Sequence, residues 1–291
     1  MTNRARIAIA TSTRGLEFDQ DLDSTLNALN DHGFEATADR WDDPTVDWSR
    51  FDLVVVRSTW NYFERRDEFL RWARSLNVVA NPPGVLEWNT DKHYLADLEA
   101  AGLPTVPTIW IGSGTDLGFD LPEGDVVVKP TVGAGGIGSA RFGPAEREEV
   151  FDHIAALLDQ GVTAMVQPYL NGIDHDGERG LIYLGQQFSH AIYKPPLLGA
   201  RGPFLTDSLT VDIIEPTKPT DADLEFAAAA LAKVPGGAEQ LLYARVDIAP
   251  SDEGSPLLIE VEVTEPNLYF NCADGAARRF AVAVEEWLTR S

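Results

Sequence analysis

The sequence has little of what marks secreted, membrane-spanning or nucleic-acid-binding proteins. Its 291 residues include one cysteine, Cys272, so no disulfide can form within the chain, and a cytoplasmic location is expected. No apolar run reaches the roughly 18 residues that a membrane-spanning helix needs. The apolar segment 7–10 is too short for the core of a signal peptide, and we expect it to form a first strand.

Basic residues are also scarce. Lysine and arginine total 23 against 46 aspartates and glutamates, which gives a formal charge of −23. Nucleic acids and anionic membrane surfaces bind basic patches, so neither is an expected partner. We expect the acidic side chains on solvated faces, and any site for an anion such as ATP must be basic locally.

The pattern of apolar segments before residue 100 predicts a small parallel α/β domain over residues 1–100. Strand-like segments alternate there with amphipathic helical segments, as in β-α-β units. The expected strands cover 6–10, 34–39, 53–57 and 78–80, and the expected helices cover 19–32, 64–76 and 90–101. The chain contains no internal repeat and no low-complexity tract.

Beyond residue 100 strand-like segments follow one another, which predicts antiparallel pairing and an α+β architecture. We divide this part into a subdomain over 101–170, with a glycine-rich loop, and a C-terminal subdomain over 171–291, with an acidic hairpin. A Gly- and Pro-rich loop is expected at 195–207. The expected helices are 144–160 and 221–234, and the expected strands are 105–111, 126–129, 139–142, 164–167, 180–184, 188–193, 210–214, 242–248 and 257–263.

The glycine-rich loop V-G-A-G-G-I-G follows an apolar strand that carries Lys129. Gly133, Gly135 and Gly138 match the G-x-G-x-x-G pattern of dinucleotide-binding turns, but such turns open a helix, whereas S-A-R-F-G-P here predicts a strand. A Walker A loop is excluded because its lysine follows its glycines. We expect a hairpin whose backbone N–H groups, including that of Gly136, wrap phosphates beside the Lys129 ammonium. A plain surface hairpin is the alternative.

An acidic hairpin is predicted between the strands at 242–248 and 257–263. With the turn centred on residues 253–254, Asp247 faces Glu260 and Arg245 faces Glu262, and all four side chains share one face. Facing carboxylates repel each other, and their oxygens are ligands that Mg²⁺ prefers, with phosphates completing its shell. The pattern predicts a Mg²⁺ site in which Arg245 binds a transferring phosphoryl oxygen. A solvated acidic face with an Arg245–Glu262 salt bridge is the alternative.

A lysine before a glycine hairpin, followed later by R-V-D and a paired E-x-E, resembles the ATP-grasp superfamily over about residues 85–270. The resemblance implies a preceding small α/β domain and ATP held between two antiparallel sheets. It also implies an enzyme that forms acyl phosphates with Mg-ATP, which an amine then attacks. The runs VVRSTWNY, ANPP, WNTDK, QPYL, FSHA and EVEVTEP further resemble the branch that contains the cycloserine-forming O-ureidoserine cyclo-ligase. That branch implies a small amino-acid-like substrate.

Carried over position by position, the resemblance implies roles for individual residues. Asp247, Glu260 and Glu262 match the metal ligands, although relatives usually carry asparagine at the place of Glu262. Lys194, which the resemblance does not assign, ends the segment F-S-H-A-I-Y-K and is expected to contact the γ-phosphate or the acyl phosphate. The nucleotide-binding positions are Lys92, Lys129, the loop Gly133–Gly138, Gln167, Tyr169 and Leu170 for adenine, and Glu178 for the ribose hydroxyls.

Residues at the carboxyl ends of the first and third expected strands are candidates for substrate binding. Parallel α/β sheets hold ligands at this edge, so we interpret Arg57 as an anchor for a substrate carboxylate. A salt bridge from Arg57 to a helix acid is the alternative. Ser58, Thr59 and Thr11 lie in the same layer and offer hydroxyls.

Two further substrate residues are expected in the second half of the chain. Arg201 lies in the Gly/Pro loop and is expected to close over the substrate. Asn267 ends the acidic hairpin segment and joins the same group.

The leading hypothesis is an ATP- and Mg²⁺-dependent ligase that forms a carbon–nitrogen bond. It covers a cyclo-ligase and a ligase that joins two amino acids. A nicotinamide-dependent oxidoreductase remains an alternative, and it requires a helix directly after Gly138. A non-catalytic nucleotide-binding module is the other alternative. A homo-oligomer is compatible with the sequence.

Overall fold

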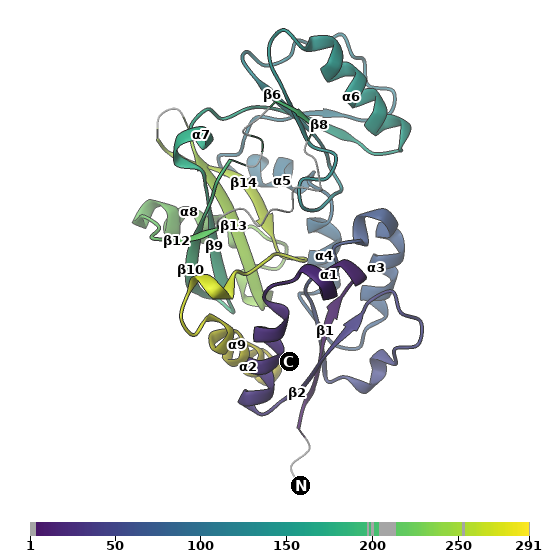
Figure 1. Cartoon of the computed structure of the whole chain (residues 1–291), viewed down its shortest axis with the longest axis vertical. Helices are drawn as coiled ribbons and strands as arrows, with labels where there is room; N and C mark the ends of the chain where they lie inside the picture. The colour runs from purple at the N-terminus through teal and green to yellow at the C-terminus, as the bar shows by residue number, and fades with distance from the viewer. Residues whose placement is uncertain (1–3, 197, 199–200, 204–213, 252–253, 291) are drawn as a thin grey trace.

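The computed structural model describes residues 4–196, 198, 201–203, 214–251 and 254–290. These residues form three β-sheets, and each sheet is built mainly from a different part of the chain (Figure 1). The first sheet is parallel, and the other two are antiparallel. The α/β plus α+β architecture expected from the sequence is therefore confirmed.

The first sheet has the strand order β2-β1-β3-β4. Its strands are β1 (Arg6–Thr11), β2 (Glu35–Arg40), β3 (Leu53–Val56) and β4 (Val79–Ala80). Side chains alternate across a strand, so Ile7 and Ile9 face a cluster with α2 (Leu22–His32), whereas Ala8 and Ala10 face a cluster with α3 (Arg66–Ser75). Helices therefore cover both faces, which explains why β3 is entirely apolar.

The helical segment predicted at 90–101 is divided differently in the structure. A helix begins earlier, as α4 (Pro83–Asn89), because a proline at the first helical position favours helix initiation. Thr90 ends α4, and its hydroxyl donates to the Glu87 carbonyl at 3.1 Å. A second helix, α5 (Tyr94–Ala100), follows after a short turn. The turn places Lys92 between two helices.

The second sheet has the order β11-β7-β6-β8-β5. Helix α6 (Arg147–Asp159) packs on it through a cluster that includes Val150 and Ile154. The glycine loop joins β6 to β7, which pair antiparallel, so the predicted strand after the loop is confirmed. The strands of this sheet are β5 (Ile109–Ile111), β6 (Val126–Pro130), β7 (Ala140–Phe142), β8 (Ala164–Pro168) and β11 (Gly202–Pro203).

The third sheet has the order β12-β10-β9-β13-β14. The short helix α7 (Ile173–Asp176) precedes it, and α8 (Asp221–Leu231) packs on it. The strand expected at 210–214 lies outside the described residues except for Ile214, which is not in a strand. The strands of this sheet are β9 (Glu178–Leu184), β10 (Gln187–Lys194), β12 (Glu215–Thr217), β13 (Tyr243–Pro250) and β14 (Pro256–Glu262).

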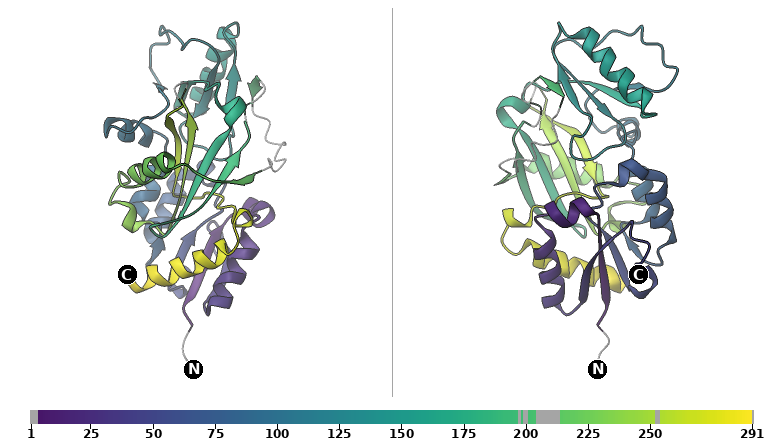
Figure 2. Two further views of the ribbon diagram at one scale, coloured as in Figure 1. Left: turned by 90° about the vertical axis from the view of Figure 1, so that its left-hand side faces the viewer. Right: turned by 45° about the vertical axis from the view of Figure 1, so that its right-hand side comes forward.

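Besides α7, one short helix and one terminal helix were not among the expected elements. Helix α1 (Thr13–Phe18) directly follows β1, and Ser12 caps it by accepting from the Gly15 amide. Helix α9 (Ala276–Arg290) ends the chain and lies beside α2 in both views (Figures 1 and 2). The two helices share one hydrophobic cluster with the first and third sheets. This cluster joins the N-terminal and C-terminal parts of the chain. The proposed domain boundaries at residues 100 and 170 remain predictions.

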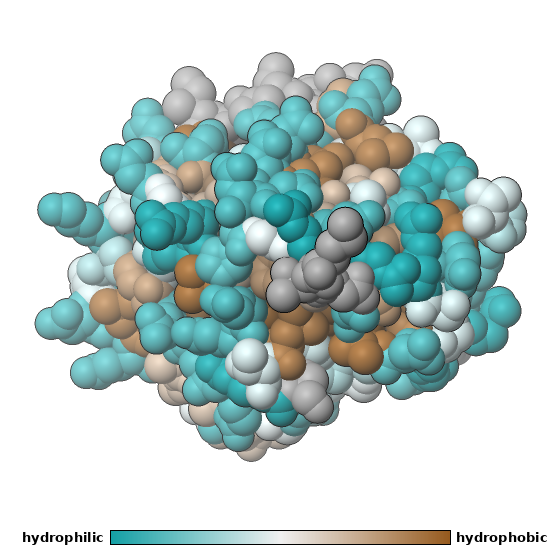
Figure 3. Space-filling view, turned by 90° about the horizontal axis from the view of Figure 1, so that it is seen from below, coloured by the Kyte–Doolittle hydropathy of each residue, from teal (hydrophilic) through white to brown (hydrophobic). Residues whose placement is uncertain are grey.

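The surface seen from below carries mostly hydrophilic side chains (Figure 3). Hydrophobic side chains on this face form small separate groups, as is ordinary for folded proteins in water. In the described part of the chain, every helix is too short or too polar to span a bilayer.

Candidate active site

A cleft of about 420 Å³ lies between the second and third sheets. This volume is within the usual range of about 300–1,000 Å³ for small-molecule sites. Gly138 is not part of its lining and packs against Pro130 instead. The predicted residues that do line the cleft are Lys92, Lys129, Gly133, Gly135, Gly136, Gln167, Tyr169, Leu170, Glu178, Lys194, Arg245, Asp247, Glu260, Glu262 and Asn267.

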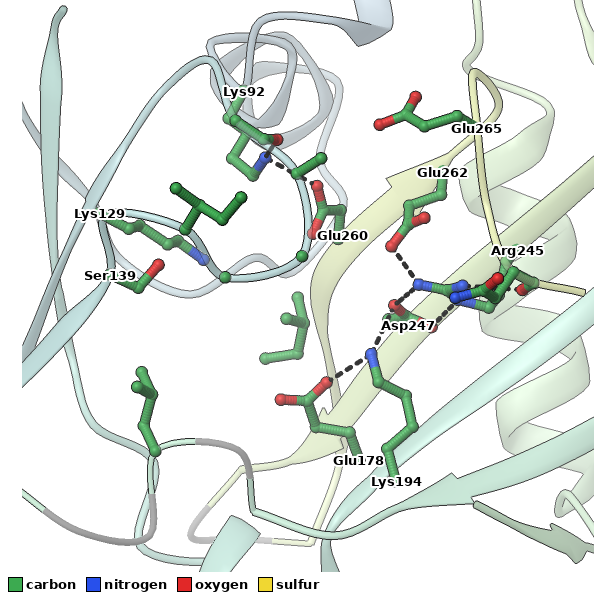
Figure 4. A pocket seen from close by; sticks show the side chains of 18 of the residues that line it. Lys92, Lys129, Ser139, Glu178, Lys194, Arg245, Asp247, Glu260, Glu262 and Glu265 are labelled. Carbon is green, nitrogen blue, oxygen red and sulfur yellow. Dashed lines mark hydrogen bonds and ion pairs between the residues drawn. The ribbon is translucent and has the colours of Figure 1, made fainter. Parts of the chain in front are cut away.

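Two lysines and the glycine loop form one wall of the cleft (Figure 4). The Lys92 ammonium donates to the Gly133 carbonyl at 3.1 Å and pairs with Glu260 at 3.0 Å. Lys129 extends from β6 toward the cleft, and no described residue forms an ion pair with it. Burial lowers the pKa of Lys129. An unpaired ammonium in this position can receive an anion.

The glycine loop adopts backbone conformations that other residues rarely take. Gly135, Gly136 and Gly138 have φ values of 60°, 74° and 77°. Side chains with a Cβ atom rarely adopt this left-handed region, so glycine is needed at these positions. The loop residues between the two strands can therefore turn their backbone amides toward a ligand.

The acidic hairpin forms the opposite wall of the cleft. Around its four charged residues, the strands pair in the register predicted from the sequence. Arg245 pairs with Glu262, and Asp247 pairs with Glu260. A bulge follows Asp247, so Ile248 faces Leu258 and the predicted register is wrong nearer the turn. The bulge absorbs one residue and leaves the four charged side chains on the cleft.

Besides Lys92, two cations pair with the carboxylates of the cleft. Arg245 donates to both oxygens of Asp247, at 2.9 and 3.0 Å, and also to Glu262. Lys194 pairs with Asp247 at 2.9 Å and with Glu178 at 3.1 Å. The Arg245–Glu262 salt bridge that the sequence left as an alternative is thus present, and it lies inside the cleft rather than on a solvated face.

Burial and charge act on these carboxyls in opposite directions. Burial acts to raise the pKa of Asp247, but the Arg245 and Lys194 charges outweigh it and hold the pKa at about 2. Burial raises the pKa of Glu262 to about 7, since the nearby charges of Glu260 and Asp247 also oppose ionisation. Glu262 is therefore the carboxyl of the hairpin that most resists ionisation.

Glu265, just after β14, is a cleft residue that the sequence did not single out. Burial, together with the Glu262 charge, raises the pKa of Glu265 to about 8. Its place after the E-V-E run was the available signal, but only the folded loop reveals that it turns into the cleft. Glu265 therefore joins the acidic groups of the site.

Stability is expected to depend on pH through Glu265. Its pKa rises from the ordinary 4.5 to about 8 on folding, so the folded chain keeps a proton that the unfolded chain releases. The free energy of unfolding should therefore fall as pH rises through this window, by at most about 1.4 kcal/mol per pH unit from this group. Urea unfolding of Glu265→Gln should show a flatter decline than that of the unsubstituted chain. Equal slopes for both proteins would contradict the expectation.

The donor set of the cleft fits Mg²⁺ in its chemistry. The carboxyl groups of Glu178, Asp247, Glu260, Glu262 and Glu265 line the cleft (Figure 4). Carboxylate oxygens are hard ligands that suit this ion, which usually takes one or two of them with phosphate oxygens. Among the described residues, no group of three or more His, Cys, Asp or Glu side chains has the spacing of a metal site. The hairpin can thus supply part of a Mg²⁺ shell that a nucleotide completes.

Arg57 and its neighbours do not reach the cleft, which corrects the prediction of a substrate anchor there. The Arg57 side chain is 1% exposed, donates to the Pro266 carbonyl at 2.7 Å and pairs with Asp21 at 3.6 Å. Ser58, Thr59 and Thr11 are also buried and absent from the cleft lining. Because Asp21 precedes α2, the salt bridge to a helix acid is the arrangement found.

Arg201 also lies away from the cleft. Its exposed guanidinium pairs with Asp125 at 2.9 Å and is absent from the cleft lining. The same carboxylate accepts from Arg141 at 2.9 Å. In this conformation Arg201 pairs at the edge of the second sheet, and its closing over a substrate remains a prediction.

The predicted adenine segment lies at the end of β8. Gln167 donates to the Thr108 hydroxyl at 2.8 Å, so its amide is held by the protein. The Tyr169 hydroxyl donates to Asp174 at 2.5 Å, and the Arg141 guanidinium lies 3.4 Å from the Tyr169 ring centroid. These contacts fix the segment beside the cleft, and its role in binding adenine remains a prediction.

Comparisons with known proteins identify the family. The cycloserine biosynthesis protein DcsG of Streptomyces lavendulae is 33% identical over 299 residues, which cover 97% of this chain and 98% of DcsG. The chain belongs to the DcsG family. The sequence family of the N-terminal domain of D-cycloserine synthetase DcsG matches residues 7–82. The crystal structure of D-cycloserine synthetase DcsG superposes with a TM-score of 0.88 at 32% identity, covering 98% of this chain and 100% of that one.

A more distant structure establishes the wider fold. The ATP-grasp ligase PsnB, solved with a minimal precursor, Mg and ADP, has a TM-score of 0.62 at 18% identity, with 98% of each chain covered. This likeness and the DcsG family together place the chain among the ATP-grasp ligases, enzymes that use ATP and form carbon–nitrogen bonds. The oxidoreductase alternative is wrong, because a strand and not a helix follows the glycine loop. The alternative of a non-catalytic module is excluded by the same family membership.

Proposed function

We propose that this DcsG-family ligase uses Mg-ATP to phosphorylate the carboxylate of a small amino-acid-like substrate and then joins the activated carbon to nitrogen. The form we favour is an O-ureidoserine-type cyclo-ligase that yields cycloserine. The observation that carries the proposal is the cleft in which the β13–β14 carboxylates face Lys92 and Lys129. The relationship to DcsG supports the cyclising form, and a ligase of two amino acids is the second candidate.

In this proposal the wall of the second sheet binds ATP. Lys129, Lys92 and the amides of the glycine loop contact its phosphates, since these groups are cationic or carry free N–H donors. Glu178 receives the ribose hydroxyls. The adenine lies against Gln167, Tyr169 and Leu170, which line the same cleft.

Glu260 and Glu262 would hold the Mg²⁺ in this proposal, together with phosphate oxygens. Bound there, the ion would offset phosphate charge and orient the phosphoryl group. Asp247 completes the acidic group, but it is 1% exposed and held by two cations, so we assign it the positioning of Arg245 and Lys194.

The proposed reaction has two substitution steps at the substrate carboxylate. A substrate carboxylate oxygen attacks the γ-phosphorus, the bond to ADP breaks, and an acyl phosphate forms. A nitrogen then attacks the carbonyl carbon, the bond to phosphate breaks, and the nitrogen loses a proton. In the cyclo-ligase form this nitrogen carries the carbamoyl group of O-ureidoserine, so water must also cleave the bond between them, which releases carbon dioxide and ammonia. Arg245 and Lys194 are the cations placed to stabilise the phosphoryl oxygens. Holding both reactants in one cleft lowers the entropic cost of each step.

The direct test measures phosphate release from Mg-ATP in a panel of substrates, with products identified by mass spectrometry. The panel contains single amino acids, O-ureidoserine of both hands, and pairs of amino acids. Release with O-ureidoserine alone, and a cyclic product, is the expected result. Release that requires two amino acids supports the second candidate. No release with any substrate contradicts the proposal.

Substitution of Lys129 tests the nucleotide wall. Lys129→Ala is expected to raise the KM for ATP by about 10- to 100-fold, because a charge-assisted phosphate contact of about 1.5–3 kcal/mol is lost. Lys233→Ala, whose ammonium donates to the Ala101 carbonyl at 2.7 Å away from the cleft, is the matched control. An unchanged KM for ATP in Lys129→Ala would contradict the assignment.

A further inference from the structure

Glu265 and Arg14 line the cleft and, like Lys129, form no ion pair with another described residue. Glu265 forms no ion pair with any described lysine or arginine, whereas Glu260, Glu262 and Asp247 all do. Arg14, on α1, also lines the cleft, and its side chain has no hydrogen bond or ion pair among the described residues. Neither residue lies on the wall formed by the second sheet.

The surroundings of Glu265 suit a positive charge. Trp60 also lines the cleft, and its indole N–H donates to the Glu265 carbonyl at 3.1 Å, which fixes the loop beside the ring. An aromatic face next to a carboxylate is a favourable environment for an ammonium group. Asn267 and Asn271 line the same region and offer further polar contacts.

Arg14 marks the outer end of this region. A side groove of about 350 Å³ continues from the cleft, and the two share Arg14, Phe18, Trp60 and Ile137. The Arg14 guanidinium is half-buried, and Phe18 beside it is 49% exposed. Arg14 lies where the cleft meets the side groove and has no partner among the described residues. Its guanidinium can therefore bind an oxygen atom of a molecule that extends from the cleft into the groove.

We propose that Glu265 binds the ammonium group of an α-amino acid and that Arg14 binds a carbonyl oxygen at the end of its side chain. This assignment rests on the proposed function. A carboxylate that is phosphorylated must point toward Arg245 and Lys194. The α-carbon of the substrate, next to this carboxylate, then places its ammonium group near Glu265, which lies three residues after Glu262. The side chain of the substrate extends toward α1. This arrangement suits the O-ureidoserine of the proposed function, whose side chain ends in a ureido carbonyl.

The test compares four probes on matched variants: O-ureidoserine, its N-acetyl derivative, O-methylserine and serine. Glu265→Gln should raise the KM for O-ureidoserine by about 10- to 100-fold without changing the KM for ATP. The preference for the free amine over the N-acetyl compound should collapse in this variant alone. Arg14→Gln should raise the same KM and lose the preference for O-ureidoserine over O-methylserine. Glu225→Gln, on the exposed face of α8, and Arg278→Gln, on α9, are controls with the same chemical changes.

Binding distinguishes failure of this assignment from failure of the proposed function. Calorimetric titration with the same probes, in the presence of a non-hydrolysable ATP analogue, does not require turnover. Weaker binding of O-ureidoserine to Glu265→Gln and Arg14→Gln would support the assignment even if no phosphate is released. Full discrimination against the N-acetyl compound in Glu265→Gln would overturn it, as would the absence of binding to the unsubstituted protein. A variant that loses preference for every probe equally, with a lower melting temperature, also counts against it.

Discussion

Replacing Glu260 by glutamine is expected to lower the rate of substrate-dependent phosphate release by about 100- to 1,000-fold, a range typical for loss of one preorganised charge contact. Glu260 points into the cleft from β14, and its side chain is 25% exposed. Burial acts to raise the pKa of Glu260, but the Lys92 and Lys129 charges outweigh it and lower the pKa. The carboxylate is therefore ionised at neutral pH and available to Mg²⁺, whereas an amide carries no charge.

The fold should survive this substitution. Lys92 keeps its hydrogen bond to the Gly133 carbonyl, and glutamine preserves the shape of the side chain. Phosphate-release kinetics and the melting temperature should be measured together, with Glu225→Gln on the exposed face of α8 as the control. A rate near that of the unsubstituted protein would contradict the assignment of Glu260 to the metal. A large fall in melting temperature would attribute the loss to folding.

Replacing Asp247 by alanine should lower the free energy of unfolding by about 3–5 kcal/mol, the usual cost of breaking a buried ion pair. Its carboxylate is almost fully buried and forms ion pairs with Arg245 and Lys194, each at 2.9 Å. Removing it leaves two cations without their shared partner in a poorly solvated place. Asp247 is therefore a poorer test of metal binding than Glu260, because its loss acts on the fold as well as on the chemistry.

Urea unfolding without nucleotide measures this effect. The matched control is Glu286→Ala, which breaks an exposed pair with Arg290 at 3.2 Å and should cost no more than about 0.5 kcal/mol. A change in Asp247→Ala as small as in the control would mean that water or a rearranged Glu262 replaces the lost carboxylate.

The acidic hairpin shows how much of the site could be predicted from the sequence. Side chains alternate on a strand, so the spacing of Arg245, Asp247, Glu260 and Glu262 was sufficient to place them on one face. The bulge after Asp247 was not predictable, because it depends on how the turn closes. The strand after the glycine loop was also predictable, because its alternating residues and the following Gly-Pro do not favour a helix.

Other residues were misplaced because their role depends on partners distant in sequence. Arg57 was expected at an open edge of the sheet. Instead, the loop that follows β14 covers this edge, and its Pro266 carbonyl accepts a hydrogen bond from Arg57. Glu265 lies in this same loop, and its place after the E-V-E run did not show that its side chain faces the cleft. Helix α9 did carry a signal, since Ala276, Phe280 and Val284 recur at helical spacing and are all buried.

Helix α9 joins the beginning of the chain to its end. The side of β1 that carries Ile7 and Ile9 belongs to the same hydrophobic cluster as Phe280 and Val284. During translation β1 and α2 leave the ribosome long before the 15 residues of α9. Because α9 supplies part of their covering, the N-terminal sheet cannot complete its core until α9 has also emerged. Its final packing therefore depends on a segment made more than 200 residues later.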